Sequence, residues 1–164
     1  MSQPALQVPD AATPEARYEG ILQALDGLLA GERNLIANLA NTAALLFDAL
    51  PDLNWAGFYL YDGTELIVGP FQGKPACVRI ALGQGVCGTA AATLSTQIVR
   101  DVHAFPGHIA CDAASNSEIV VPLANARGLL GVLDLDSPSL GRFDERDQKG
   151  LEALARRLIA ASDW

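Results

Sequence analysis

Long hydrophobic runs are missing from this sequence of 164 residues. No apolar stretch approaches the ~18 residues that a membrane-spanning helix needs, so no membrane span is expected. The first ten residues, MSQPALQVPD, have no basic region and no apolar segment of signal-peptide length. Their prolines and small polar residues predict a flexible N-terminal tail over residues 1–12. A cytoplasmic location is the expectation that follows.

Basic residues are also few: 11 Lys and Arg stand against 19 Asp and Glu, which gives a formal net charge of −8. Phosphate binding needs clustered Lys and Arg, so neither nucleic acid nor an anionic membrane surface is expected as a partner. A ligand that carries a cationic group would be attracted. Half of the residues are hydrophobic, and the length suits one globular domain with a substantial core.

The sequence contains three cysteines, Cys77, Cys87 and Cys111. An odd number, without a signal peptide, argues against a structural disulfide framework. No pair has C-x-x-C spacing, so neither a zinc ribbon nor a thioredoxin motif is indicated. By residue type alone, all three could be small buried hydrophobic residues. A zinc site made of the three cysteines and His108 is a further alternative, which the spacing supports little.

No Walker loop and no dinucleotide-binding fingerprint is present, so nucleotide binding is not supported and no cofactor is expected. The glycines of LGQGVCGTAA, residues 82–91, surround a predicted helix N-terminus. Their backbone N–H groups could bind an anion, although an ordinary turn into a helix is the alternative. Cys87 lies in the first turn of this helix, where the helix dipole favours the thiolate.

Hydrophobic periodicity predicts helices and short strands joined by turns, which favours an α+β domain with a mainly antiparallel sheet. The first helix has Thr13 as a cap and Pro14 in its first turn. Asp144 can cap the last helix. The predicted helices are residues 13–32, 33–50, 83–95 and 144–164, and the predicted strands are 54–63, 65–69, 76–82, 97–102 and a strand–turn–strand unit at 118–137.

Three acidic residues lie near strand ends. The alternation of GLLGVLDLDS puts Asp134 and Asp136 on one face of a strand. Glu118 would lie nearby if this strand pairs with the preceding one across the turn ANARG. Crowded carboxylates raise one another's pKa, so one could stay protonated as a general acid, and the cluster could also bind an ammonium group. It could bind a metal instead, but a hard cation prefers more oxygen ligands than these residues supply. The alternative is that all three simply face water.

The segment HIACDAASNSEIVVPL, residues 108–123, places Cys111 in a loop of small residues that we expect to be mobile and accessible. Trp55 and Tyr59 share one face of the strand at 54–63, as core residues or as the wall of a pocket. His103 and His108 receive no role.

Four segments together resemble a GAF domain, and more narrowly the free methionine-(R)-sulfoxide reductases. The resemblance covers about residues 32–160. It implies a single GAF domain over residues 13–164, with N- and C-terminal helices on one side of the sheet. A short helix and loops would cover a ligand pocket on the other side. The matching segments are NWAGFYLY, GPFQGKPACVRIALGQGVCGTAA, DVHAFPGHIACDAASNSEIVVPL and GVLDLDSP.

The resemblance also implies site residues. The catalytic nucleophile would be Cys111, the resolving cysteine Cys77 and an auxiliary resolving cysteine Cys87. Three carboxylates would bind the substrate: Glu118, Asp134 and Asp136. Glu118 and Asp136 would also take part in catalysis. The aromatic wall of the pocket would be Trp55 and Tyr59.

The activity implied is thiol-dependent reduction of free L-methionine (R)-S-oxide through a cysteine sulfenic acid and an intramolecular disulfide. Thioredoxin would recycle the disulfide, and a homodimer could form through the terminal helices. The alternative is a non-catalytic GAF module that binds a small ligand or senses redox state.

Overall fold

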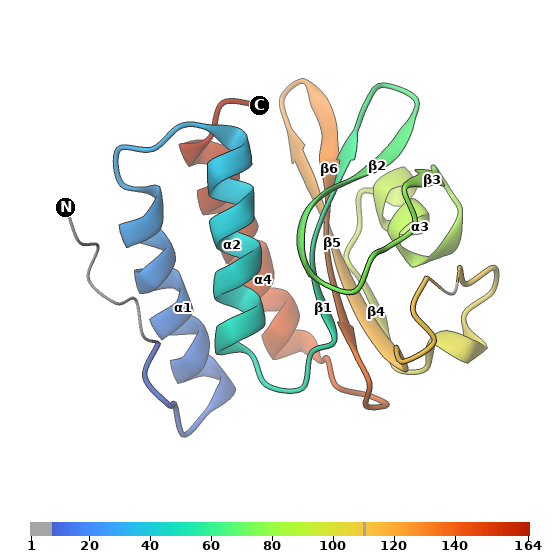
Figure 1. The fold of residues 1–164 in the computed structure, drawn as a ribbon, viewed down its shortest axis with the longest axis horizontal. Helices are drawn as coiled ribbons and strands as arrows, with labels where there is room; N and C mark the ends of the chain where they lie inside the picture. The colour runs from blue at the N-terminus through green and yellow to red at the C-terminus, as the bar shows by residue number, and fades with distance from the viewer. Residues whose placement is uncertain (1–7, 110) are drawn as a thin grey trace.

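A six-stranded sheet forms the centre of the protein in the computed structural model, which describes residues 8–109 and 111–164. Over these residues the chain has four α-helices, one short 3₁₀ helix and the six strands (Figure 1). The helices are α1 (Pro14–Leu29), α2 (Leu35–Ala49), α3 (Gly85–Thr93), the 3₁₀ helix (Val102–Ala104) and α4 (Glu145–Ala161). The strands are β1 (Trp55–Tyr61), β2 (Glu65–Gly73), β3 (Arg79–Ala81), β4 (Gln97–Val99), β5 (Ser117–Asn125) and β6 (Gly128–Ser137).

Every strand pairing in this sheet is antiparallel over the described residues, in the order β3-β2-β1-β6-β5-β4. β5 and β6 form a hairpin whose turn ends at Gly128, where a φ of 112° favours glycine. The predicted strand–turn–strand unit and the mainly antiparallel sheet are therefore confirmed.

The sheet separates two layers (Figure 1). Helices α1, α2 and α4 pack on one face, whereas α3 and the loops around it lie on the other. Side chains alternate along β1 accordingly: Ala56 and Phe58 enter the helical core, and Trp55 and Tyr59 enter the second core. The predicted α+β arrangement is confirmed, with the terminal helices on one side of the sheet and a short helix and loops on the other. No helix in residues 8–109 and 111–164 is long and apolar enough to cross a membrane.

The helix caps agree with the sequence. Thr13 Oγ1 accepts a hydrogen bond from the N–H of Ala16 at 3.1 Å, and Asp144 forms a capping box with Asp147. The helix predicted over residues 33–50 forms as α2, but two of its large apolar side chains remain exposed: Ile36 at 57% and Phe47 at 37%. The buried face of α2 includes core residues such as Leu39 and Leu46. It also includes Asn38, whose amide donates to Ser162 Oγ at 2.9 Å.

β2 is longer than predicted, and β3 and β4 are shorter. The prediction ended β2 before Pro70, but the strand continues through Phe71 to Gly73. Gly57 permits this, because a Cβ at Gly57 would lie only 2.3 Å from the Cβ of Phe71. The register of β1 and β2 shifts between Gly57 and Tyr59, which accommodates the proline at an irregular position.

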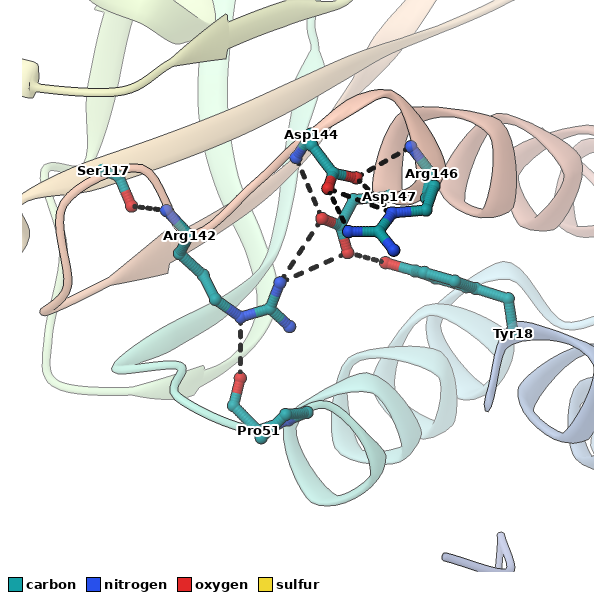
Figure 2. Close-up of polar contacts among 7 residues, drawn as sticks. All are labelled: Tyr18, Pro51, Ser117, Arg142, Asp144, Arg146 and Asp147. Carbon is teal, nitrogen blue, oxygen red and sulfur yellow. Dashed lines mark hydrogen bonds and ion pairs between the residues drawn. The ribbon is translucent and has the colours of Figure 1, made fainter. Parts of the chain in front are cut away.

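A buried polar network joins the helical layer to the start of β5 (Figure 2). Arg142 pairs with Asp147 at 3.3 Å and donates through Nε to the carbonyl of Pro51 at 3.1 Å. Tyr18 donates its hydroxyl to Asp147 at 2.7 Å. The backbone N–H of Arg142 donates to Ser117 Oγ at 3.3 Å. The network therefore holds α1, α2 and α4 against the residue that precedes Glu118.

The predicted tail over residues 1–12 falls partly outside the described residues, which begin at Val8. Residues 8–11 have no regular secondary structure, and Val8 packs against the helical core.

Candidate active site

A cavity of about 50 Å³ opens on the face of the sheet that α3 and the loops cover. At ~10–15 Å³ for each water, this volume has room for a few water molecules or a short side chain. Seven of the eight predicted site residues line it, and the eighth, Cys77, is bonded to one of them. The seven are Trp55, Tyr59, Cys87, Cys111, Glu118, Asp134 and Asp136.

A disulfide joins Cys77 to Cys111, with the two Cα atoms 5.5 Å apart. Cys77 lies between β2 and β3, and Cys111 lies in the loop before β5, 34 residues later. The fold therefore brings two distant segments together at the cavity. Since both sulfurs are in the disulfide, they cannot act as thiolate ligands, and the zinc site with His108 is not formed.

The predicted crowding of three carboxylates is confirmed. Glu118 on β5 is the direct cross-strand partner of Asp136 on β6, and Val120 is the partner of Asp134. The two-residue period then puts all three carboxylates on the cavity side. Glu118 is 6% exposed and Asp134 is 5% exposed, so the alternative in which they face water is wrong.

Burial and mutual repulsion keep these carboxyl groups protonated to unusually high pH. Burial, then the charges of Asp134 and Asp136, raise the pKa of Glu118 well above its ordinary value. Burial raises the pKa of Asp134 to about 6. Burial and Asp134 also raise the pKa of Asp136. The cavity thus contains carboxyl groups that can donate a proton near neutral pH.

Cys87 lies in the first turn of α3, as predicted, but the prediction of a favoured thiolate is wrong. Its Sγ is buried and lies 3.8 Å from Glu118 Oε1. Burial, then the charges of Asp134 and Glu118, raise the pKa of the Cys87 thiol well above its ordinary value. Local sequence indicated only the helix dipole, whereas the fold adds the carboxylates from two strands.

The aromatic residues form one wall of the cavity. Trp55 stacks on Tyr59, with ring centroids 5.8 Å apart, and on Phe71, with centroids 5.1 Å apart. Trp55 Nε1 donates to the carbonyl of Lys74 at 3.1 Å, and the Tyr59 hydroxyl donates to the carbonyl of Cys77 at 3.2 Å. The wall therefore also holds the segment that carries Cys77. Phe71 was not predicted beside these rings, because the strand predicted from sequence ended before Pro70.

Asn54 is a second residue that the sequence analysis missed. Its Nδ2 donates to Asp112 Oδ2 at 3.1 Å and to Ser115 Oγ at 3.0 Å. Its backbone N–H donates to the carbonyl of Asp136 at 3.0 Å. Asn54 thus ties the loop after Cys111 to the strand that carries the carboxylates. No local pattern in the sequence marks this contact, because it joins segments 58 residues apart.

Ile109, in the segment before Cys111, lies at the start of α3. Ile109 lines the cavity, and a Cβ at Gly85 would lie 3.3 Å from its Cγ1. Gly85 also has a φ of +62°, which favours glycine. His108 lines the cavity as well, and burial, then His103, lower the pKa of His108. Its imidazole is therefore neutral at pH 7.

The glycine turn before α3 is only partly available as an anion site. The N–H of Gly83 donates to the carbonyl of Gly88, and the N–H of Gly88 donates to the carbonyl of Gln84. The side chain of Gln84, the N-cap residue, makes no capping hydrogen bond. Two residues of the first turn, Gly85 and Val86, line the cavity. The first N–H groups of a helix have no partner within the helix.

The GAF domain family matches residues 36–161, which is most of the chain. The chain belongs to the GAF domain family. Among GAF proteins, the chain is 53% identical to the free methionine-R-sulfoxide reductase of Escherichia coli over 150 residues, covering 90% of this chain and 91% of the relative. It is 49% identical to the Saccharomyces cerevisiae enzyme of the same name over 150 residues, covering 87% and 83%.

Similar solved structures include one that contains a substrate. It is the X-ray structure of free methionine-R-sulfoxide reductase from Neisseria meningitidis in complex with its substrate, which is 47% identical to this chain. The match covers 93% of this chain and 92% of that chain, with a TM-score of 0.89. The resemblance to this group of GAF proteins is therefore confirmed.

Proposed function

We propose that this protein is an oxidoreductase that reduces free L-methionine (R)-S-oxide to L-methionine with thiols. One observation carries the proposal: the disulfide-bonded pair Cys77–Cys111 and three carboxyl groups, two of them buried, meet at one cavity. A sulfoxide becomes a good electrophile when its oxygen receives a proton, and the carboxyl groups have the raised pKa that a proton donor needs. The names of the E. coli and S. cerevisiae relatives support the same activity.

In the first step, Glu118 or Asp136 donates a proton to the sulfoxide oxygen while the Cys111 sulfur attacks. The oxygen passes to Cys111, which becomes a sulfenic acid, and methionine leaves as the reduced thioether. The carboxyl groups disfavour a thiolate at Cys111, so sulfur attack and proton transfer are coupled in this proposal.

In the second step, the Cys77 thiol condenses with the Cys111 sulfenic acid, releasing water and forming the disulfide. The Cα separation of 5.5 Å lies in the usual range for a disulfide. A dithiol protein, thioredoxin, then reduces the bond by thiol–disulfide exchange. The proposed role of Cys87 is auxiliary, because its thiol is buried and held protonated.

Both charged ends of a free amino acid have a candidate partner. Asp134 Oδ1 is buried and makes no hydrogen bond to the described residues, so it can accept from the substrate ammonium. The substrate carboxylate can reach N–H groups in the first turn of α3, at Gly85 and Val86. Trp55 and Tyr59 would contact the methylthio end. A peptide-bound residue lacks both charges and would leave these polar groups unpaired.

The setting of the reaction is part of the proposal. Thioredoxin implies the reducing cytoplasm, where dithiol reductants operate. A homodimer through the terminal helices also remains a prediction, and exposed Ile36 on α2 is compatible with such a contact.

Turnover coupled to thioredoxin, thioredoxin reductase and NADPH tests the proposal. The free R epimer should be reduced, and the free S epimer and a peptide-bound R epimer should not. Absence of turnover with the free R epimer would overturn the enzyme assignment. A redox sensor or ligand-binding module would instead form the Cys77–Cys111 disulfide with peroxide and show no dependence on methionine sulfoxide.

A further inference from the structure

Three buried donor atoms from three elements meet beside the cavity. They are Cys87 Sγ on α3, a carboxylate oxygen of Glu118 on β5 and a carboxylate oxygen of Asp134 on β6, all within 4.8 Å of one another. All three residues are buried. A thiol and two carboxylates form a mixed sulfur and oxygen donor set, which differs from the all-oxygen sets that Ca²⁺ and Mg²⁺ prefer.

Asp134 gives a separate indication of a cationic ligand. It is 5% exposed and lines the cavity, and its Oδ1 makes no hydrogen bond to the described residues. A buried carboxylate oxygen without a partner is costly, and a cation in the cavity would compensate it. The substrate ammonium would satisfy this oxygen only while substrate is bound, whereas a metal ion would satisfy it in the free protein.

The distances suit a small divalent cation. Cys87 Sγ and Glu118 Oε1 are 3.8 Å apart. Zinc bonds of about 2.3 Å to sulfur and about 2.1 Å to oxygen span that separation when the angle at the metal is roughly 120°. A side-chain rotation of Asp134 would supply the third bond, and a water in the cavity would supply the fourth.

We propose that Cys87, Glu118 and Asp134 form a binding site for zinc inside the cavity. The ion replaces the thiol proton and any carboxyl protons, which pass to solvent. Zinc at this position engages both the carboxylate that faces the substrate ammonium and a candidate proton donor. Bound zinc therefore competes with methionine sulfoxide. This competition rests on the proposed function, but zinc binding itself does not.

The site is complete in the oxidised protein. Cys77 and Cys111 are bonded to each other, so Cys87 is the thiol that remains in the chain. An experiment on the oxidised form therefore separates this site from any metal binding by the catalytic cysteine pair. It also keeps the test independent of turnover.

Cobalt is the spectroscopic probe for this test. The tag-free full-length chain, with the Cys77–Cys111 disulfide intact, is titrated with Co²⁺ under anaerobic conditions. We expect one equivalent to bind and to give a thiolate-to-cobalt charge-transfer band. One equivalent of Zn²⁺ should abolish the band, and about a 100-fold excess of Mg²⁺ should not, because Mg²⁺ does not favour a thiolate ligand. Absence of a charge-transfer band would overturn the proposal.

Matched variants locate the site. Cys87→Ser should abolish the band, and Asp134→Asn should weaken Co²⁺ binding by about tenfold or more. Asp136→Asn is the control. It makes the same chemical change two residues along β6, at a residue outside the donor set. It should weaken Co²⁺ binding less than about threefold. Equal weakening by the two Asn variants would show general attraction to a negative cavity and would overturn the assignment. If Cys87→Ser does not fold, the charge-transfer band of the wild-type protein and the Co²⁺ affinities of the two Asn variants still test the proposed site.

Discussion

Glu118 and Asp136 lie directly opposite each other on β5 and β6. Side chains at such positions have Cβ atoms about 4.5–5.5 Å apart, and like charges there repel. Both are also buried or nearly so, and burial is the largest cause of the raised pKa of each. The pair can therefore keep at least one proton near neutral pH, which is the property that the proposed reaction requires.

Replacing Glu118 with Gln should reduce kcat/KM for free methionine-(R)-sulfoxide by about 10²–10⁴-fold if Glu118 is the proton donor. A general acid acts while protonated, so wild-type activity should fall as pH rises through the raised pKa of this group. The pH profile of the remaining activity should lose that decline in Glu118→Gln. Asp136→Asn provides the comparison. If it removes the decline and Glu118→Gln does not, Asp136 is the donor.

The two bonded cysteines should differ in their mutant phenotypes. Cys111→Ser should abolish turnover even with excess dithiothreitol, because the attacking sulfur is lost. Cys77→Ser should retain turnover with dithiothreitol, which can reduce a sulfenic acid directly, but should lose most turnover with thioredoxin. Coupled assays with each reductant measure the difference. Equal losses in both variants under both conditions contradict the assigned roles.

Asp134→Asn should stabilise the oxidised protein at neutral pH. The folded pKa of Asp134, about 6, is above its ordinary value of 3.8. Between these values the unfolded chain releases the proton while the folded protein retains it, so this group lowers the free energy of unfolding as pH rises from about 4 to 6. The variant should therefore match wild type near pH 4 and exceed it by about 1–3 kcal/mol at pH 7.

Urea unfolding of both proteins at several pH values checks this prediction. Other carboxylates, such as Asp112, have a lowered pKa and make the protein more stable as pH rises; the N–H of Ala114 lowers the pKa of Asp112. This contribution is the same in both proteins, so it cancels when their free energies of unfolding are subtracted. If the difference in free energy of unfolding between variant and wild type stays constant from pH 4 to pH 7, the prediction is wrong.

Tyr18→Phe should lower the free energy of unfolding by about 1.5–3 kcal/mol, because a buried hydrogen bond to a charged carboxylate is lost. The bond is the 2.7 Å contact to Asp147 shown in Figure 2. Tyr61→Phe is the matched control, because its hydroxyl bonds the carbonyl of Gly63 at an exposed position, and it should change stability by less than about 0.5 kcal/mol. Similar values for the two variants in urea unfolding would contradict a stabilising role for the network.

Local periodicity explains which parts of the site could be predicted from sequence. The alternation of β6 placed Asp134 and Asp136 on one face, and the turn at Asn125–Gly128 brought Glu118 beside them. Both features depend on the pleat of a strand and on a short hairpin, which neighbouring residues control. The same alternation correctly placed Trp55 and Tyr59 together.

Features that depend on distant packing could not be predicted in this way. β2 runs through Pro70 because Gly57 on the neighbouring strand leaves room for Phe71. Asn54 contacts the loop after Cys111 across 58 residues of sequence. Neither contact has a local signal, because each needs two segments whose separation is set by the whole fold.

The sequence by itself determined the order of helices and strands, the faces on which the carboxylates and aromatic residues lie, and the three cysteines available. Only the tertiary structure decided that Cys77 bonds Cys111 and that Cys87 remains a buried thiol. The physical reason is that a helix turn or strand pleat acts over a few residues. Burial and electrostatic repulsion, in contrast, depend on every element that surrounds the atom. At Cys87, burial and then the carboxylates of β6 and β5 raise the thiol pKa well above its ordinary value.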